Sequence, residues 1–282
     1  MNIDQYAQKI RHIDPNSHKG QNGKVLVVGG SELFHAASRW ALDVVSSMVD
    51  MVFYSSVPEN NTLIAQAKKE FWSGVVIPRG EIENYIEEAD VILIGPGMTR
   101  DEDDHEHSTL NNQYSIPTAK QWNSDTFAIT NYLLSTYPTK KWVIDAGALQ
   151  MINPFLLNTK CIITPHIGEY ERLLKKISPD QLLENNVTVL LKGKTDLISS
   201  KDRNERIEGG NAGMTKGGTG DALAGLVAGL YAFTDDPFAA AVVGSYVNKK
   251  AGDTLFEQFG PFFRTNQLVE QIPKTLKHTL QY

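Results

Sequence analysis

A glycine-rich segment at residues 209–226, GGNAGMTKGGTGDALAGL, has the composition best suited to holding a ligand. Glycine in a regular element costs roughly 0.5 to 1 kcal/mol relative to alanine, so this density indicates a backbone that must approach another group closely. Residues 217–221, GGTGD, open an apolar segment with helical spacing. The free N–H groups and positive end of such a helix attract anions, so we predict a phosphate site there.

Asp221 is the one acid in this segment, and two interpretations fit it. A carboxylate near a helix N-terminus is a favourable charge, but beside a bound phosphate it would also suit removal of a proton from an attacking hydroxyl. The segment is not a P-loop, because no Lys-Ser/Thr pair follows the glycines. It is not a dinucleotide fingerprint either, since that motif belongs on the first strand–helix turn.

The hydrophobic pattern of the sequence predicts the strands and helices that must position these residues. Short β-branched runs bounded by Gly, Pro or Asp predict strands, most of them buried on both faces. These runs are 24–30, 51–56, 74–78, 91–95, 127–130, 142–146, 161–165, 187–191 and 195–199. Helical spacing occurs at 38–49, 81–89, 168–177, 219–233 and 236–256. The alternation predicts an α/β fold with a mostly parallel central sheet and helices on both faces, and we expect residues 1–282 to form a single domain.

Composition limits the class of function. The chain has 282 residues, 41% hydrophobic and 21% charged, and a net charge of −6, which indicates a globular protein without the basic patch that nucleic acid requires. No apolar run approaches the roughly 20 residues of a membrane span, and the N-terminus does not resemble a signal peptide. We therefore expect a cytoplasmic protein with a small-molecule partner. The lone Cys161 sits in an apolar run and is expected to be a buried hydrophobe without chemistry.

Ligands of open α/β sheets bind beyond the carboxyl ends of the strands, so the loops that follow strands are the candidates. The unusual ones are GGSELFHAAS, GPGMT, PHIGE and the glycine-rich segment. The acidic run at 101–108, DEDDHEHS, has the residue types of a metal site, but its acids and histidines crowd consecutive positions. A solvated loop is the preferred interpretation of that run, with a ligand cluster as the alternative.

Six motifs in this order resemble the ADP- or ATP-dependent NAD(P)H-hydrate dehydratases of the ribokinase-like superfamily. They are HKGQNGKVLVVGGS, ILIGPGM, VIDAGAL, ITPHIGEYERL, VLLKGKTDLI and GNAGMTKGGTGDALAGL, and they cover nearly the whole chain. The resemblance implies a ribokinase-like three-layer fold and repair of hydrated NADH or NADPH (NADHX, NADPHX), with ADP or ATP as co-substrate and Mg²⁺. It also implies a homo-oligomer. Because the pattern begins near His18, we expect a dehydratase domain without the epimerase domain that many relatives carry.

The resemblance also implies roles for individual residues. Asp221 matches the general base, which deprotonates the ring hydroxyl of the hydrate as it attacks the terminal phosphoryl group. Ala37, Gly97 and His166, with Asp221, match positions that contact the hydrate. The positions expected to bind the nucleotide are Lys192, Gly193, Lys194, Thr195, Asp196, Asn211, Gly217, Gly218, Thr219 and Gly220. Gly218 is expected where a side chain would collide with phosphates, so that valine there would weaken nucleotide binding and leave the fold largely intact.

Several of these residues have plainer interpretations. Residues 191–196 also fit a simple hairpin with an exposed Lys192, His166 also fits a helix cap, and Asn211 also fits a turn. No dedicated metal cage is visible, so the metal ligands are unknown; Asp145 and Glu169 are the candidate acids for an ion held mainly by the nucleotide.

The sequence departs from the family pattern at four places. Gly147 replaces the second acid of the Asp-Ala-Asp-Ala-Leu run, residues 36–38 read Ala-Ala-Ser, residues 46–52 read SSMVDMV where the following helix usually ends in glycines, and Asp196 stands where threonine is common. These departures keep two alternatives open, a small-molecule kinase of the same fold that acts on a vitamin precursor and a nucleotide-binding sensor without turnover.

Overall fold

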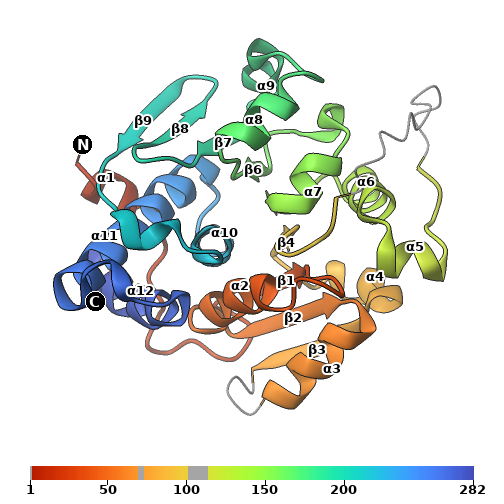
Figure 1. The fold of residues 1–282 in the computed structure, drawn as a ribbon, viewed down its shortest axis with the longest axis horizontal. Coiled ribbons are helices and arrows are strands. Elements are labelled where there is room, and N and C mark those ends of the chain that lie inside the picture. The colour runs from red at the N-terminus through yellow and green to blue at the C-terminus, as the bar shows by residue number, and fades with distance from the viewer. Residues whose placement is uncertain (1, 69–72, 101–113) are drawn as a thin grey trace.

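A nine-stranded sheet forms the centre of the protein, in the order β3-β2-β1-β4-β5-β6-β7-β8-β9 (Figure 1). The computed structural model describes residues 2–68, 73–100 and 114–282. Pairing is parallel from β3 to β7 and antiparallel where β8 and β9 extend the sheet. The strands are β1 (Lys24–Val28), β2 (Met51–Ser56), β3 (Gly74–Pro78), β4 (Val91–Ile94), β5 (Lys141–Ile144), β6 (Cys161–Ile163), β7 (Thr188–Leu191), β8 (Asp196–Ser200) and β9 (Arg203–Ile207).

Twelve α-helices within the described ranges connect and cover these strands. They are α1 (Asp4–Ala7), α2 (Ala36–Ser46), α3 (Pro58–Ala67), α4 (Ile82–Ile86), α5 (Ala119–Ser124), α6 (Thr126–Thr136), α7 (Ala146–Met151), α8 (Ile167–Leu173), α9 (Pro179–Glu184), α10 (Thr219–Tyr231), α11 (Pro237–Phe259) and α12 (Thr265–Thr279). Their described parts contain no helix with both the length and the apolar character to cross a lipid bilayer.

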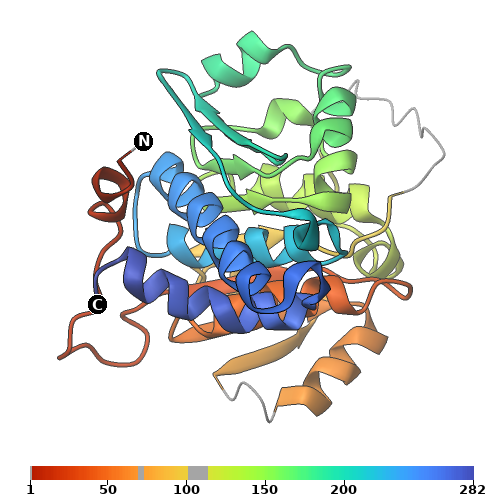
Figure 2. The same cartoon turned by 60° about the vertical axis from the view of Figure 1, so that its left-hand side comes forward.

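Two hydrophobic cores lie on opposite faces of the sheet. Val25 and Val27 belong to one core and Leu26 and Val28 to the other, because successive side chains of a strand point to opposite faces. Helices α2, α10, α11 and α12 contribute to the first core, and α4 to α9 contribute to the second. Figure 2 shows α11 and α12 side by side across the first face. The structure therefore confirms the expected three-layer α/β architecture.

Two local predictions were incomplete. Residues 127–130, expected as a strand, lie in α6, where the Asp125 side chain caps the helix by accepting a hydrogen bond from the Ala128 N–H at 2.8 Å. Phe, Ile and Thr favour strands, but this preference depends on context. Here packing decides, because helix α6 buries Ile129 and Leu133. Strand β9, in contrast, was not predicted. Its sequence RNERI is mostly polar, and exposed residues alternate with more buried ones along the strand.

Cys161 is fully buried, as expected, and burial raises the pKa of its thiol to about 12. A thiol with that pKa holds its proton at neutral pH, so it is unsuited to nucleophilic chemistry. The acidic run at 101–108 lies outside the described residues.

Parallel pairing brings the carboxyl ends of β1, β4, β5 and β6 to one edge of the sheet. The loops at this edge approach one another so closely that two glycines have no space for a side chain. A Cβ added at Gly95 would lie 1.8 Å from the Asp145 carbonyl oxygen, and a Cβ added at Gly29 would lie 2.5 Å from the Pro96 carbonyl oxygen. These contacts leave room only for hydrogen. The loops that carry the candidate residues are thus packed directly on one another.

Candidate active site

Within the glycine-rich segment, Gly218 forms the N-terminal cap of α10 in the left-handed conformation, with φ of +98°. A Cβ added there would lie 2.1 Å from Cε3 of the Trp40 ring. The first obstacle to a side chain is therefore an indole of the protein itself, which contradicts the expectation that valine there would leave the fold largely intact. The expected collision with phosphates stays a prediction. The Thr219 hydroxyl donates to the Met214 carbonyl at 2.7 Å and fixes the turn.

Gly218→Ala should therefore destabilise the fold, whatever it does to ligand binding. A left-handed residue with a Cβ costs roughly 1 to 2 kcal/mol, and displacement of the indole adds to that cost. Gly217→Ala is the matched control, because Gly217 has no atom within 4 Å of an added Cβ. Urea unfolding of both variants measures the difference; equal midpoints for the two would contradict the assigned role of Trp40.

Asp221 lies in the first turn of α10, as predicted. Burial, followed by the negative charge of Asp145, raises the pKa of its carboxyl to about 7, although the positive charge of Lys192 opposes the shift. A carboxyl group with a pKa near neutrality is poised to accept a proton and release it again. The environment of Asp221 is thus that of a proton-transfer group.

A buried ion pair adjoins Asp221. Lys192 Nζ lies 2.8 Å from Asp145 Oδ1, and the same oxygen accepts a hydrogen bond from the Thr164 hydroxyl at 2.8 Å. Asp145 is 1% exposed. Burial disfavours the charge of Lys192, but the negative charges of Asp145 and Glu169 outweigh it and raise the pKa of Lys192. Lys192 therefore stays cationic, and its Nζ lies 3.4 Å from the position of a Cβ at Gly220, in the first turn of α10.

His166 occupies the N-terminal cap of α8. Its Nδ1 accepts hydrogen bonds from the Gly168 and Glu169 N–H groups at 3.0 and 3.3 Å, and the Glu169 carboxylate accepts one from the His166 N–H at 2.9 Å. The plainer interpretation, a capping residue, is therefore realised. His166 also forms an isolated parallel bridge with Lys192 and keeps 53% of its side chain exposed, so it stays accessible to a ligand beside the ion pair.

Ala37 and Gly97 lie together, although they come from α2 and the loop after β4. A Cβ added at Gly97 would lie 3.0 Å from the Ala37 Cβ and 2.9 Å from the Phe34 carbonyl oxygen. Gly147 has a related explanation, because a Cβ there would lie 2.2 Å from the Met98 carbonyl oxygen. This backbone has no space for the acid that the family pattern places at position 147.

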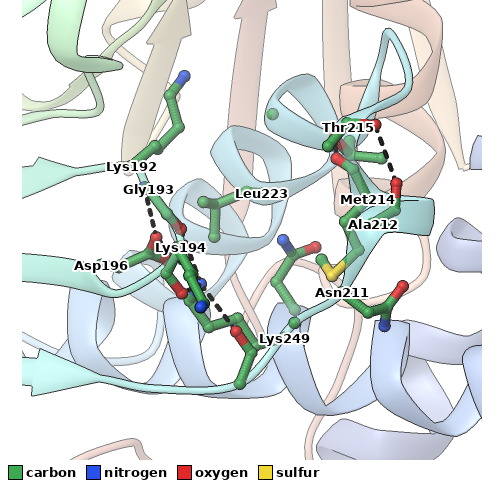
Figure 3. A pocket seen from close by; sticks show the side chains of 15 residues that line it. Lys192, Gly193, Lys194, Asp196, Asn211, Ala212, Met214, Thr215, Leu223 and Lys249 are labelled. Carbon is green, nitrogen blue, oxygen red and sulfur yellow. Dashed lines mark hydrogen bonds and ion pairs between the residues drawn. The ribbon is translucent and has the colours of Figure 1, made fainter.

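A cavity of about 500 Å³ opens beside the first turn of α10 (Figure 3). The turn between β7 and β8 lies on one side of it and residues 209–215 on the other, with Leu223 of α10 between them. Its lining residues are Lys192, Gly193, Lys194, Asp196, Gly209, Gly210, Asn211, Ala212, Met214, Thr215, Thr219, Gly220, Leu223, Asn248 and Lys249. Seven of the ten residues expected to bind a nucleotide line this cavity, whereas Thr195, Gly217 and Gly218 do not.

The side chains of Asp196 and Asn211, which line the cavity, form hydrogen bonds within the protein. Asp196 Oδ1 accepts from the Gly193 N–H at 2.9 Å, and its Oδ2 accepts from the Ser245 hydroxyl at 2.7 Å. Asn211 Oδ1 accepts from the Gly213 N–H at 3.0 Å, and its Nδ2 donates to Asp253 Oδ1 at 3.0 Å. Both side chains hold the walls of the cavity in place.

The sequence analysis missed Asn248 and Lys249 of α11. Lys249 Nζ donates to the carbonyl oxygens of Gly193, Lys194 and Gly209 at 3.0 to 3.3 Å and so joins the two walls, as the dashed lines to the Gly193–Lys194 turn in Figure 3 illustrate in part. A signal was present, because these polar residues interrupt the apolar face of the predicted helix at 236–256.

The acidic side chains of the site indicate how a Mg²⁺ ion could be held there. Among the described residues, no three His, Cys, Asp or Glu side chains are arranged to hold a metal ion. Asp145 is engaged by Lys192 and Thr164, and Glu169 is engaged by the His166 backbone and by Gln150 at 3.1 Å. This donor set fits an ion bound mainly through phosphate oxygens, as Mg²⁺ often is, with one or two carboxylates nearby.

The mostly parallel α/β sheet with its antiparallel edge, followed by a glycine-rich helix start, has the arrangement of a ribokinase-like fold. A ribokinase-like superfamily protein from Enterococcus faecalis superposes with a TM-score of 0.79, at 24% identity, over 100% of this chain and 96% of its own. An ADP/ATP-dependent NAD(P)H-hydrate dehydratase from Bacillus subtilis, co-crystallized with ATP/Mg²⁺, gives a TM-score of 0.73 at 21% identity, over 99% of this chain and 97% of its own. These structural similarities show that the chain has a ribokinase-like fold.

The family follows from the sequence match. The NAD(P)H-hydrate dehydratase family profile matches residues 25–274, and the chain belongs to that family. It is 35% identical to the bifunctional NAD(P)H-hydrate repair enzyme Nnr of Methanocaldococcus jannaschii, over 95% of this chain but only 51% of that enzyme. It is 31% identical to the ADP-dependent (S)-NAD(P)H-hydrate dehydratase of Cenarchaeum symbiosum, over 93% of this chain and 91% of that protein. The chain thus spans about half the length of its bifunctional relatives.

Proposed function

We propose that this protein dehydrates the S epimer of NADHX or NADPHX with ADP, or alternatively ATP, and releases AMP or ADP and phosphate. The observation that carries the proposal is Asp221, a carboxyl group with a pKa of about 7 in the first turn of a glycine-rich helix. It lies beside a cationic lysine and a cavity large enough for much of a nucleotide. The family to which the chain belongs supports this choice of substrates.

The proposed reaction begins when the Asp221 carboxylate takes the proton from the ring hydroxyl of the hydrate. The hydroxyl oxygen attacks the terminal phosphorus of the nucleotide, a new O–P bond forms, and the phosphoanhydride bond breaks. The C–O bond of the ring then breaks with phosphate as the leaving group, and loss of a ring proton restores the dihydropyridine. Phosphate thus leaves in place of hydroxide, which is a poorer leaving group, and cleavage of one phosphoanhydride bond drives the reaction.

The protein groups that stabilise the developing charge are the start of α10 and Lys192. Residues 218–221 would offer backbone N–H groups to phosphoryl oxygens, and the fixed direction of those groups favours the transition state. Lys192 Nζ, next to Gly220, would add a positive charge on the same side. If Mg²⁺ binds with the nucleotide, Asp145 and Glu169 are the candidate acids that would help to hold it, and its positive charge would neutralise developing negative charge on the phosphates. The homo-oligomer and the cytoplasmic location stay predictions.

The direct test is incubation of the protein with NADHX, ADP and Mg²⁺ while the absorbance of reduced nicotinamide is followed. Return of that absorbance, with AMP and phosphate in equal amounts, is the expected result. A stable phosphorylated product would instead indicate a kinase. Binding of both ligands without turnover would indicate a sensor.

The pH dependence of kcat/KM should reveal the raised pKa of Asp221. Because the base must be ionised, and because burial and Asp145 raise its pKa to about 7, the rate should fall as the pH drops below 7 and level off above about 8. Well below the pKa the expected slope is tenfold per pH unit. ADP affinity measured over the same range separates this effect from titration of the nucleotide; a rate that is constant from pH 5 to 8 would contradict the assignment.

A further inference from the structure

The first residue of α12 contacts the glycine-rich turn that precedes α10. The Thr265 hydroxyl donates a hydrogen bond to the Gly217 carbonyl oxygen at 2.8 Å, although the two residues lie 48 positions apart in the chain. Thr265 is 6% exposed. Helix α12 packs against both α2 and α10, so the hydroxyl reaches the turn from a packed interface.

Thr265 uses its hydroxyl differently from the later threonines of α12. The hydroxyls of Thr275 and Thr279 donate to carbonyl oxygens four residues earlier in the same helix. That bond is common for a threonine inside a helix. Thr265 instead bonds to a separate segment, and it therefore helps to set the position of that segment.

The glycine turn has little else to hold it on this side. Gly217 is exposed, and no atom lies within 4 Å of a Cβ added there. Its neighbour Gly218 lies against the Trp40 ring, and Trp40 Nε1 donates to Asn266 Oδ1 at 2.6 Å. Thr265 and Asn266, consecutive residues of α12, thus brace two consecutive glycines, the first directly and the second through the indole.

The bond to Gly217 also fixes the direction of a donor. Because the peptide unit is planar, the Gly218 N–H points opposite to the Gly217 carbonyl and so away from Thr265. Gly218 is the first of the residues whose N–H groups meet phosphoryl oxygens in the proposed reaction. Donors stabilise a transition state only when they are held in the correct direction, so a small displacement of this peptide should cost rate.

We propose that Thr265 is a positioning residue for the terminal phosphoryl group, with its hydroxyl holding the Gly217–Gly218 peptide in the orientation that binds this group. This inference rests on the proposed function, since it takes the start of α10 to bind the phosphate that is transferred. The hydroxyl should therefore matter for ADP, which carries that phosphate, and not for AMP, which lacks it.

Thr265→Val removes the hydroxyl with little change in volume, and water can bond to the exposed Gly217 in its place. In the assay of NADH recovery with ADP, kcat should fall about tenfold or more, with KM for the hydrate unchanged. Calorimetry without the hydrate should show that the wild type binds ADP more tightly than AMP. The variant should lose most of this preference through weaker binding of ADP, while its affinity for AMP stays the same.

Two further variants separate positioning from a general effect on the fold. Thr265→Ser keeps the hydroxyl and should behave as the wild type. Thr275→Val is the matched control, because it removes a hydroxyl from a residue of the same helix that is 7% exposed and whose side-chain hydrogen bonds stay within that helix. It should keep the wild-type kcat and the wild-type preference for ADP.

Three results overturn the inference: a wild-type kcat and ADP preference in Thr265→Val, an equal loss of ADP and AMP affinity in that variant, or a serine variant as impaired as the valine one. If the wild type restores NADH in these cases, the proposed function stands. If the wild type restores no NADH but Thr265→Val abolishes its preference for ADP, the proposed function falls and the positioning role stands. A wild type that binds neither nucleotide, or both equally, overturns the positioning role as well.

Discussion

Asp221→Asn should lower the rate of NADHX repair by about 10²- to 10⁴-fold while leaving the dissociation constant of ADP close to that of the wild type. Asparagine keeps the shape and hydrogen-bonding capacity of the side chain but cannot accept the hydroxyl proton, and general-base catalysis typically contributes this much to the rate. The decisive measurements are the initial rate of NADH recovery and the calorimetric affinity for ADP. Turnover near the wild-type value would show that Asp221 is not the base.

Stability measurements on the same variant separate the base from a mere helix-terminal charge. If Asp221 only stabilised the start of α10, its loss would cost about 0.3 to 1 kcal/mol. Its pKa in the folded protein is raised from 3.8 to about 7, so the unfolded chain releases this proton first as the pH rises. The wild type therefore loses stability between about pH 4 and 7, and the Asn variant should gain in relative Tm over that window.

Lys192→Met should destabilise the protein by about 3 to 5 kcal/mol and also weaken ADP binding. The substitution leaves the carboxylate of Asp145, which is 1% exposed, without its ion-pair partner, and an unpaired buried charge is among the most costly defects in a protein. It also removes the positive charge next to the first turn of α10. Urea unfolding and ADP titration measure the two effects.

The double variant Asp145→Asn/Lys192→Met tests the reason for this loss. Removing the second charge should restore part of the stability, because the buried carboxylate is gone, but it should not restore the affinity for ADP. Lys194→Met is the matched control for stability, since Lys194 is exposed in the same turn and its loss should change unfolding by less than about 0.5 kcal/mol. A stability loss that is equal in Lys192→Met and Lys194→Met would refute the role of the ion pair.

Most of the fold could be predicted because its strands are continuous apolar runs. Those at residues 91–95 and 161–165 stand out in the sequence, and burial on both faces gives them that composition. The failures occurred where burial is less uniform. Residues 127–130 have strand-like composition but gain more by packing as part of α6, and β9 is a polar edge strand that leaves no apolar signal.

The sequence named candidate site residues, whose roles stay predictions, but it could not give the contacts between them. Sequence motifs identified Asp221, Lys192 and Asp145, yet the bond between the last two joins residues 47 positions apart. The roles of Asp196 and Asn211 in holding the cavity walls, and the contact of Gly218 with Trp40, likewise depend on partners that no local pattern specifies.

The sequence by itself determined the family, the layered fold, the helix that begins after Gly218 and the acid that follows it, because each of these depends on local composition and order. Only the tertiary structure decided the proton affinity of Asp221, the engagement of Asp145 by Lys192, and the position of Asn248 in a cavity wall. The physical reason is that pKa, ion pairing and hydrogen-bond satisfaction are set by burial and by distances through space, which folding brings about between segments far apart in the chain.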